Sequence, residues 1–108
     1  MLDEQQFRRN ADESLTRLER ALEKSAAEFE FDVDRSEGAL TVEFEDPPAR
    51  FVVSPNSPVR QIWVSARVRS FKLDWSDIAG DFVLPDGRNL RQLLADVIGQ
   101  QLGETITL

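Results

Sequence analysis

The 108-residue chain contains neither histidine nor cysteine. It therefore has no imidazole general base or imidazole metal ligand, and no disulfide, thiolate nucleophile or cysteine-ligated cluster. No apolar run approaches the roughly 20 residues that a membrane-spanning helix needs. The five glycines form no phosphate-cradling loop. These absences point away from an enzyme and away from a transmembrane protein.

The first residues, Met1-Leu2-Asp3-Glu4, lack the character of a signal peptide or of a transit peptide. We therefore expect a cytoplasmic protein. The length suits one hydrophobic core, and the chain shows neither an internal repeat nor a linker. We expect a single domain over residues 1–108.

The formal net charge of −7 is unevenly distributed along the chain. Residues 1–46 hold 14 acidic and six basic side chains, whereas residues 47–108 hold six acidic and seven basic ones. Nucleic-acid binding requires a basic surface, so we expect no nucleic-acid partner. The split favours cations or a basic protein surface as partners. Plain solubility, for which excess acid is common, is the simpler alternative.

Residues 4–26 predict an amphipathic helix, because Phe7, Ala11, Leu15, Leu18 and Leu22 recur at steps of three and four. At 100° per residue, the charged side chains sort into two lanes. The acidic lane beside the apolar stripe contains Asp12, Glu19 and Glu23, and the basic lane further round contains Arg9, Arg17, Arg20 and Lys24.

Residues 28–34 alternate strictly and predict a strand with Phe29, Phe31 and Val33 facing inward. Four carboxylates would then point outward, namely Glu28, Glu30, Asp32 and Asp34. Such a row discourages pairing at a sheet edge, which is its simplest interpretation. The functional interpretation is a solvent-facing acidic ladder continuous with Glu19 and Glu23.

The remaining pattern predicts further strands and one more helix. We expect strands over residues 39–45, 50–54, 58–65, 71–74 and 81–84, separated by turns at 36–38, 46–48, 55–58, 67–70 and 85–87. Asn89 with Gln92 forms a capping box for a helix that Gly103 ends. Residues 104–108 could lie back along the helices. The expected fold class is α+β, a two-layer α-β sandwich in which both helices pack on one face of a single antiparallel sheet of about six strands.

The strand at 58–65 places Ile62 and Val64 on one face and Gln61 and Trp63 on the other. If the second face meets water, Trp63 is a large exposed aromatic that partner binding would explain. The alternative is that a helix or loop covers Trp63.

The same stretch, Pro58-x-x-Gln61-x-Trp63-x-Ser65, resembles the central strand signature of the frataxin family, small iron-linked proteins of iron–sulfur cluster assembly. The resemblance continues through Phe71-Lys72-Leu73-Asp74-Trp75 and Asp86-Gly87-x-x-Leu90-x-x-Leu93-Leu94. It includes the second strand at 38–45, and the ending at 103–108 is similar to the bacterial branch.

The resemblance implies a non-enzymatic protein that modulates iron–sulfur cluster assembly as an iron donor or sensor. Iron, as Fe²⁺ or Fe³⁺, would bind weakly at surface carboxylates, which by resemblance are Asp3, Glu19, Glu23, Glu28, Glu30 and Asp32. The same ridge would dock on a basic patch of a cysteine desulfurase, and the open sheet face would meet the assembly machinery. The partners would be the desulfurase and the iron–sulfur scaffold protein, with contacts from Glu19, Glu23, Asp34, Gln61 and Trp63. We expect a monomer, with metal-dependent oligomers as the alternative.

Several positions depart from the family pattern. Arg8 stands where bacterial relatives often have histidine, and Arg20 and Lys24 stand where acids are usual. Ala26 and Ser54 replace a common acid and a common asparagine, and residues 67–70 replace a glycine-rich turn. These departures favour an alternative function, an acidic protein-interaction module that has kept the fold and lost significant iron binding. A weak ferroxidase activity is the enzymatic alternative.

Overall fold

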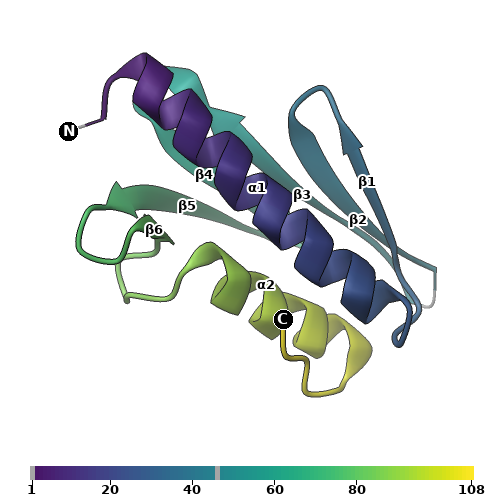
Figure 1. Ribbon diagram of the computed structural model, residues 1–108. Coiled ribbons are helices and arrows are strands. Elements are labelled where there is room, and N and C mark those ends of the chain that lie inside the picture. Colours follow the sequence, from purple (N-terminus) through teal and green to yellow (C-terminus); the bar gives the residue numbers. More distant parts are fainter. Residues whose placement is uncertain (1, 46) are drawn as a thin grey trace.

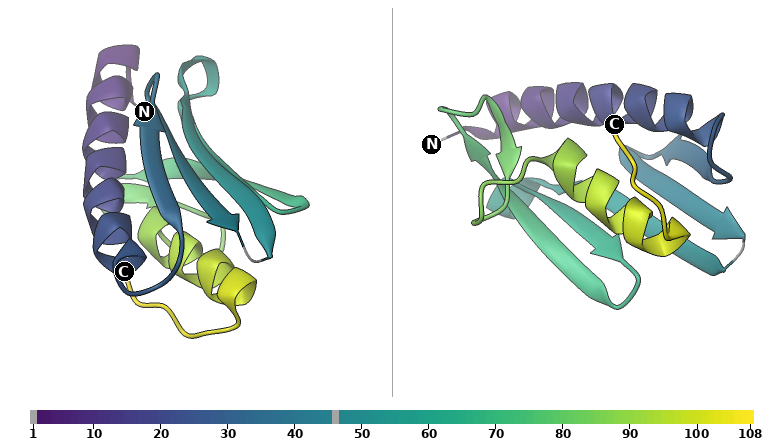
Figure 2. Two further views of the ribbon diagram at one scale, coloured as in Figure 1. Left: turned by 90° about the vertical axis from the view of Figure 1, so that its right-hand side faces the viewer. Right: turned by 90° about the horizontal axis from the view of Figure 1, so that it is seen from below.

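The computed structural model describes residues 2–45 and 47–108, so that Met1 and Asp46 lie outside the described residues. The elements are α1 (Glu4–Ala26), β1 (Asp32–Ser36), β2 (Ala39–Glu45), β3 (Pro48–Asn56), the 3₁₀ helix η1 (Ser57–Val59), β4 (Gln61–Ala66), β5 (Arg69–Ser76), β6 (Asp81–Val83) and α2 (Leu90–Leu102). The described strands form one antiparallel sheet in the order β1-β2-β3-β4-β5-β6. Both helices cover the same face of this sheet (Figures 1 and 2). The predicted two-layer α+β fold is confirmed.

Helix α1 has the predicted boundaries and the predicted buried stripe. Asp3 caps it by accepting a hydrogen bond from the Gln6 backbone, and the Gln6 side chain accepts one from the Asp3 backbone in return. All five apolar residues of the predicted stripe are at most 2% exposed. Phe7 packs edge-on against Phe82 of β6, which ties the start of α1 to the far edge of the sheet.

The prediction of a strand over residues 28–34 is wrong at its first half. Helix α1 runs to Ala26, and the backbone N–H groups of Glu28 and Phe29 both donate to the Ser25 carbonyl, which wraps the chain round the helix end. The chain must reverse there before it can pair, so β1 begins only at Asp32. Glu28 and Glu30 consequently lie in the turn rather than on the strand.

Other strand boundaries also differ from the prediction. Strand β3 extends from Pro48 to Asn56, because pairing with β2 starts directly after the turn and pairing with β4 continues to its last residue. The expected rigid turn at 55–58 is therefore displaced to residues 57–60, where η1 forms most of it, so β4 begins at Gln61 rather than at residue 58. The expected loop at 67–70 shrinks to two residues, which lengthens β5 at its start.

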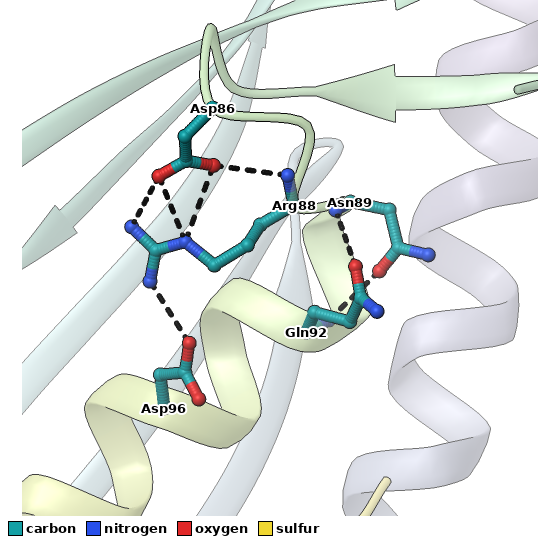
Figure 3. Close-up of polar contacts among 5 residues, drawn as sticks. All are labelled: Asp86, Arg88, Asn89, Gln92 and Asp96. Carbon is teal, nitrogen blue, oxygen red and sulfur yellow. Dashed lines mark hydrogen bonds and ion pairs between the residues drawn. The ribbon is translucent and has the colours of Figure 1, made fainter.

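Helix α2 begins and ends as predicted. Asn89 and Gln92 exchange the two hydrogen bonds of a capping box (Figure 3). Gly103 takes the left-handed conformation at φ 69° that ends the helix. Before the cap, Arg88 bonds to both Asp86 and Asp96. The hydrogen bond from the Arg88 side chain, followed by that from its backbone, holds the pKa of Asp86 below its ordinary value.

The core lies between the helices and the sheet, and its largest fully buried side chains are Phe7, Phe51 and Phe82. After α2 the chain folds back toward α1, as Figure 2 shows for the yellow segment, and Ile106 is only 7% exposed. Gly99 permits this reversal: the Glu104 N–H bonds to the Gly99 carbonyl, and the Glu104 carbonyl would lie 2.7 Å from a Cβ at position 99. The prediction that the tail lies back along the helices is thus confirmed.

Candidate functional site

Trp63 lies on the face of the sheet that the helices leave open. Strand alternation buries Ile62 and Val64 at 0% and 1% exposure, whereas Trp63 is 38% exposed. The indole interacts with Gln61 and Lys72 on its own sheet face, and both helices pack on the opposite face (Figures 1 and 2). The alternative in which a helix or loop covers Trp63 is therefore wrong.

A polar network holds Trp63 in place. Its indole N–H donates to the Gln61 side chain at 2.9 Å, and Gln61 in turn donates to Asp74 of β5 at 3.1 Å. The Lys72 ammonium lies 5.0 Å from the centre of the indole ring, at a distance typical of a cation–π contact. The register explains the grouping, since Trp63 pairs with Lys72 and Gln61 pairs with Asp74. The result is an oriented aromatic surface with exposed polar neighbours.

A second feature lies at the end of the sandwich where α1 stops and β1 begins. There a hollow of about 600 Å³ is lined in part by apolar side chains, among them Phe31 and Leu102. Its walls carry six carboxylates, which are Glu28, Glu30, Asp32, Glu43, Glu45 and Glu104. We call this the acidic hollow. No basic side chain is among the described residues that line it.

The sheet register adds to the repulsion in the acidic hollow. Asp32 of β1 stands directly opposite Glu43 of β2, and like charges so placed destabilise a sheet. Arg50 of β3 pairs with Glu43 on its other side, but the charged atoms are 3.9 Å apart and both side chains are mostly exposed. The hollow therefore keeps most of its negative charge available to solvent and to a binding partner.

The acidic lane of α1 has a different environment, because Arg35 of β1 lies against it. The Arg35 guanidinium donates to Asp12 at 2.7 Å, to Thr16 at 2.7 Å and to Glu19 at 3.5 Å. The Arg35 side chain is only 19% exposed. Val33 and Arg35 thus face the helix, so that Asp32 and Asp34 lie on the opposite side of β1. The expected ladder continuous with Glu19 is interrupted by this arginine.

The structure brings together three of the six carboxylates predicted to bind metal, Glu28, Glu30 and Asp32, in the acidic hollow. Asp3 is far from them, because it caps the opposite end of a 23-residue helix that spans about 35 Å at about 1.5 Å per residue. Glu19 contacts Arg35, and Glu23 is exposed one turn further on. Of the predicted partner contacts, Gln61 and Trp63 are adjacent and Asp34 is exposed on β1.

Sequence reasoning missed several residues of these features, namely Arg35, Glu43, Glu45, Lys72, Asp74 and Glu104. The outward positions of Glu43 and Glu45 follow from the alternation of β2, so the pattern contained that signal. Lys72 and Asp74 depend on the register of β5, and Arg35 depends on how α1 crosses β1. Neither the register of β5 nor the crossing of α1 over β1 can be inferred from one sequence.

Carboxylate oxygens are the only strong metal ligands that these residues offer, and they suit hard cations. Among the described residues, no three acidic side chains converge on one point in a way that could hold a metal ion. Exposed carboxylates suit weak, salt-sensitive binding of hard cations. Across residues 2–45 and 47–108, neither helix is long and apolar enough to cross a membrane.

Comparisons with known proteins agree with this architecture. The family model of the frataxin-like domain matches residues 1–104 of this chain. The iron-sulfur cluster assembly protein CyaY of Dechloromonas aromatica is 33% identical over 99% of each chain, and that of Azotobacter vinelandii is 31% identical over 97% of this chain and 94% of its own.

Among solved structures, frataxin from Psychromonas ingrahamii superposes with a TM-score of 0.83. It covers 98% of this chain and 97% of its own, at 22% identity, and shows the same fold. The open-face tryptophan, the acidic hollow and these matches lead to one conclusion: the chain belongs to the frataxin-like family, in its bacterial CyaY branch.

Proposed function

We propose that this chain is a non-enzymatic iron–sulfur cluster assembly protein of the bacterial cytoplasm that modulates assembly by docking on the machinery and delivering or sensing iron. The observation that carries the proposal is the acidic hollow, in which six carboxylates line one concave surface without a basic neighbour among the lining residues. The names of the CyaY relatives support the process, and the open face around Trp63 supplies a second contact.

Iron in this proposal is cargo. Fe²⁺ or Fe³⁺ would bind through the carboxylates of the hollow, chiefly Glu28, Glu30 and Asp32. Because the hollow is open to solvent and its acids do not converge, we expect weak affinity and strong sensitivity to salt. Glu23 extends this negative surface along α1, and Glu19 contributes only when Arg35 releases it. Asp3 is committed to capping α1.

Docking in this proposal depends on electrostatic attraction and on one aromatic side chain, Trp63. The acidic hollow faces a basic surface of the cysteine desulfurase, and Asp34, Gln61 and Trp63 contact the scaffold protein from the open sheet face. An exposed tryptophan whose ring is already held by Gln61 and Lys72 loses little side-chain freedom on binding. Such a preorganised aromatic is typical of residues that dominate an interface.

The test compares two double variants of equal net charge. Glu28→Gln with Glu30→Gln removes two charges from the acidic hollow, and Asp12→Asn with Glu19→Gln removes two from the lane held by Arg35. We expect the first to weaken binding to the desulfurase by about tenfold and the second by less than about twofold. Calorimetry at physiological salt measures both. Equal losses would show that net charge alone governs docking.

A second candidate function is an acidic interaction module without significant iron binding. The ion pairs of Arg35 favour it, because they occupy Asp12 and Glu19 on the helix that the family uses for metal. An anaerobic NMR titration with Fe²⁺, repeated with Mg²⁺, separates the two functions. Signal loss confined to residues around the acidic hollow with iron alone supports delivery or sensing. An equal, diffuse response to both ions supports the module.

A further inference from the structure

A basic surface lies between the two helices, on the side of α1 away from β1. Two neighbouring hollows of about 310 and 300 Å³ follow this groove, and Arg17 and Arg91 line both of them. Arg20 and Lys24 line the second hollow, which has no acidic side chain among its described lining residues, whereas Asp81 lines the first hollow. We call these four residues, Arg17, Arg20, Lys24 and Arg91, the basic groove. All four side chains are exposed.

The basic groove is not neutralised by the protein itself. Within the described part of the chain, no ion pair joins any of its four cations to an acid, although acids outnumber bases by 20 to 13 in the sequence. Glu13 stands one turn before Arg17 and forms no ion pair with it. Arg17, Arg20 and Lys24 are spaced by three and four residues, an arrangement of like charges that destabilises a helix slightly.

From this unpaired, concave cluster we propose that the basic groove binds an acidic peptide segment of a partner protein. The proposal is independent of the acidic hollow, which would bind the opposite charge. The two hollows adjoin at Arg17 and Arg91, and together they offer cations from both helices to an extended chain. Guanidinium groups pair with carboxylates through two parallel hydrogen bonds, and three of the four cations are arginines.

Two other anionic occupants fit less well. A second copy of this chain would have to present its acidic hollow, but that surface is concave, like the groove, and two molecules of net charge −7 repel each other. Nucleic acid would meet four cations surrounded by an excess of acids, whereas such binding needs a wide basic footprint. An acidic peptide needs only the local charge of the groove.

The test uses a fluorescein-labelled hexaglutamate peptide and fluorescence anisotropy at low and at physiological salt. Arg20→Glu with Lys24→Glu reverses two groove charges, and Arg9→Glu with Arg67→Glu makes the same change in net charge elsewhere. We expect the groove variant to weaken binding by about tenfold or more and the control variant by less than about twofold. Amide NMR shifts should cluster at residues 17–24 and at Arg91.

Neutral substitutions guard against misfolding, so Arg17→Gln with Arg91→Gln is measured as well, with thermal unfolding as a check on each variant. We expect it also to weaken hexaglutamate binding, by about fivefold. Equal losses in the groove and control variants would overturn the proposal. So would tighter binding of a 12-nucleotide single strand at the same amides, or self-association in sedimentation that the groove variant abolishes.

Discussion

Arg35 of β1 forms ion pairs with Asp12 and Glu19 of α1. The six carboxylates of the acidic hollow, in contrast, have no basic residue among the described residues that line it with them. Both regions are acidic, and the turn that carries Glu28 and Glu30 directly follows α1. Their charges nevertheless differ in availability, since the guanidinium already binds the acids of α1 at 2.7 and 3.5 Å. The nearest basic contact of the hollow is Arg50, 3.9 Å from Glu43. A count of acids along the chain therefore overstates the charge that a partner meets.

The comparison also shows which acids contribute to stability and which oppose it. Acids of the helix lane accept hydrogen bonds from a half-buried arginine, and such charge-assisted bonds stabilise the fold. In the hollow the acids face one another, as Asp32 faces Glu43, and their repulsion destabilises the fold. A surface that keeps a destabilising arrangement is more easily explained by binding than by folding.

The largest expected effect follows from Gly99→Ala, because a Cβ there would meet the Glu104 carbonyl at 2.7 Å. That backbone is held by its own hydrogen bond to Gly99, so relief would displace Glu104 from the acidic hollow. Overpacking of this kind costs about 1–3 kcal/mol, although alanine recovers about 1 kcal/mol of helix propensity. We expect a net loss in urea unfolding. Gln100→Ala, on the exposed side of α2, is the control and should change stability by less than about 0.5 kcal/mol.

Arg35→Gln would remove the difference between the two acidic regions. We expect a loss of about 1 kcal/mol in the free energy of unfolding, since the bonds to Asp12 and Glu19 are charge-assisted but partly exposed. Paramagnetic broadening by Mn²⁺ should spread from residues around the hollow to residues 12–23. Arg69→Gln changes the net charge equally and should leave the broadening where it is. An unchanged Mn²⁺ pattern in Arg35→Gln would contradict the role of the arginine.

Asp32→Asn tests the repulsion in the acidic hollow, where we expect a gain in stability instead of a loss. Removing the charge that faces Glu43 should stabilise the protein by a few tenths of a kcal/mol, up to about 1 kcal/mol, because a like-charge cross-strand pair disappears. Asp34→Asn, whose partner is Thr41, should change stability very little. Thermal unfolding at low salt measures both. A destabilised Asp32→Asn would mean that this carboxylate has a favourable contact.

The smallest effect concerns Asp86, whose exposed carboxylate has a lowered pKa because of the hydrogen bonds from Arg88. A lowered pKa in the folded state gives a contribution that is complete above the ordinary value of 3.8 and is lost as pH falls through the folded value. An NMR pH titration of the Asp86 carboxyl carbon should show a midpoint below 3.8, and Arg88→Gln should move it back up. Unchanged midpoints in the variant would exclude Arg88 as the cause.

Sequence alone predicted the features that depend on local pattern. The buried stripe of α1, both ends of α2 and the inward faces of the strands follow from periodicity and capping residues. The alternation over 28–34 predicted a strand that is too long, because the pattern continues through residues that must turn after α1. Where a helix stops relative to its sheet depends on tertiary packing, which periodicity does not record.

The candidate site was less predictable than the fold. Gln61 and Trp63 were placed together because one strand carries both. The acidic hollow gathers residues from a turn, two strands and the C-terminal segment, and Arg35 reaches α1 across a gap of 16 or more positions in sequence. Such groupings require the crossing of α1 over β1, which one sequence does not specify.

The uninterrupted strand order has a consequence for how quickly the molecule can fold. Each strand pairs with its immediate successor, so every ladder can close as a hairpin over a short loop, at low entropic cost. The two ends of the chain meet where α1 packs against β6 and α2, and where the C-terminal segment folds back toward α1 (Figure 2). We therefore expect the six-stranded sheet to form early and α1 to dock on it late. The docking of α1 would then complete the acidic hollow beside β1.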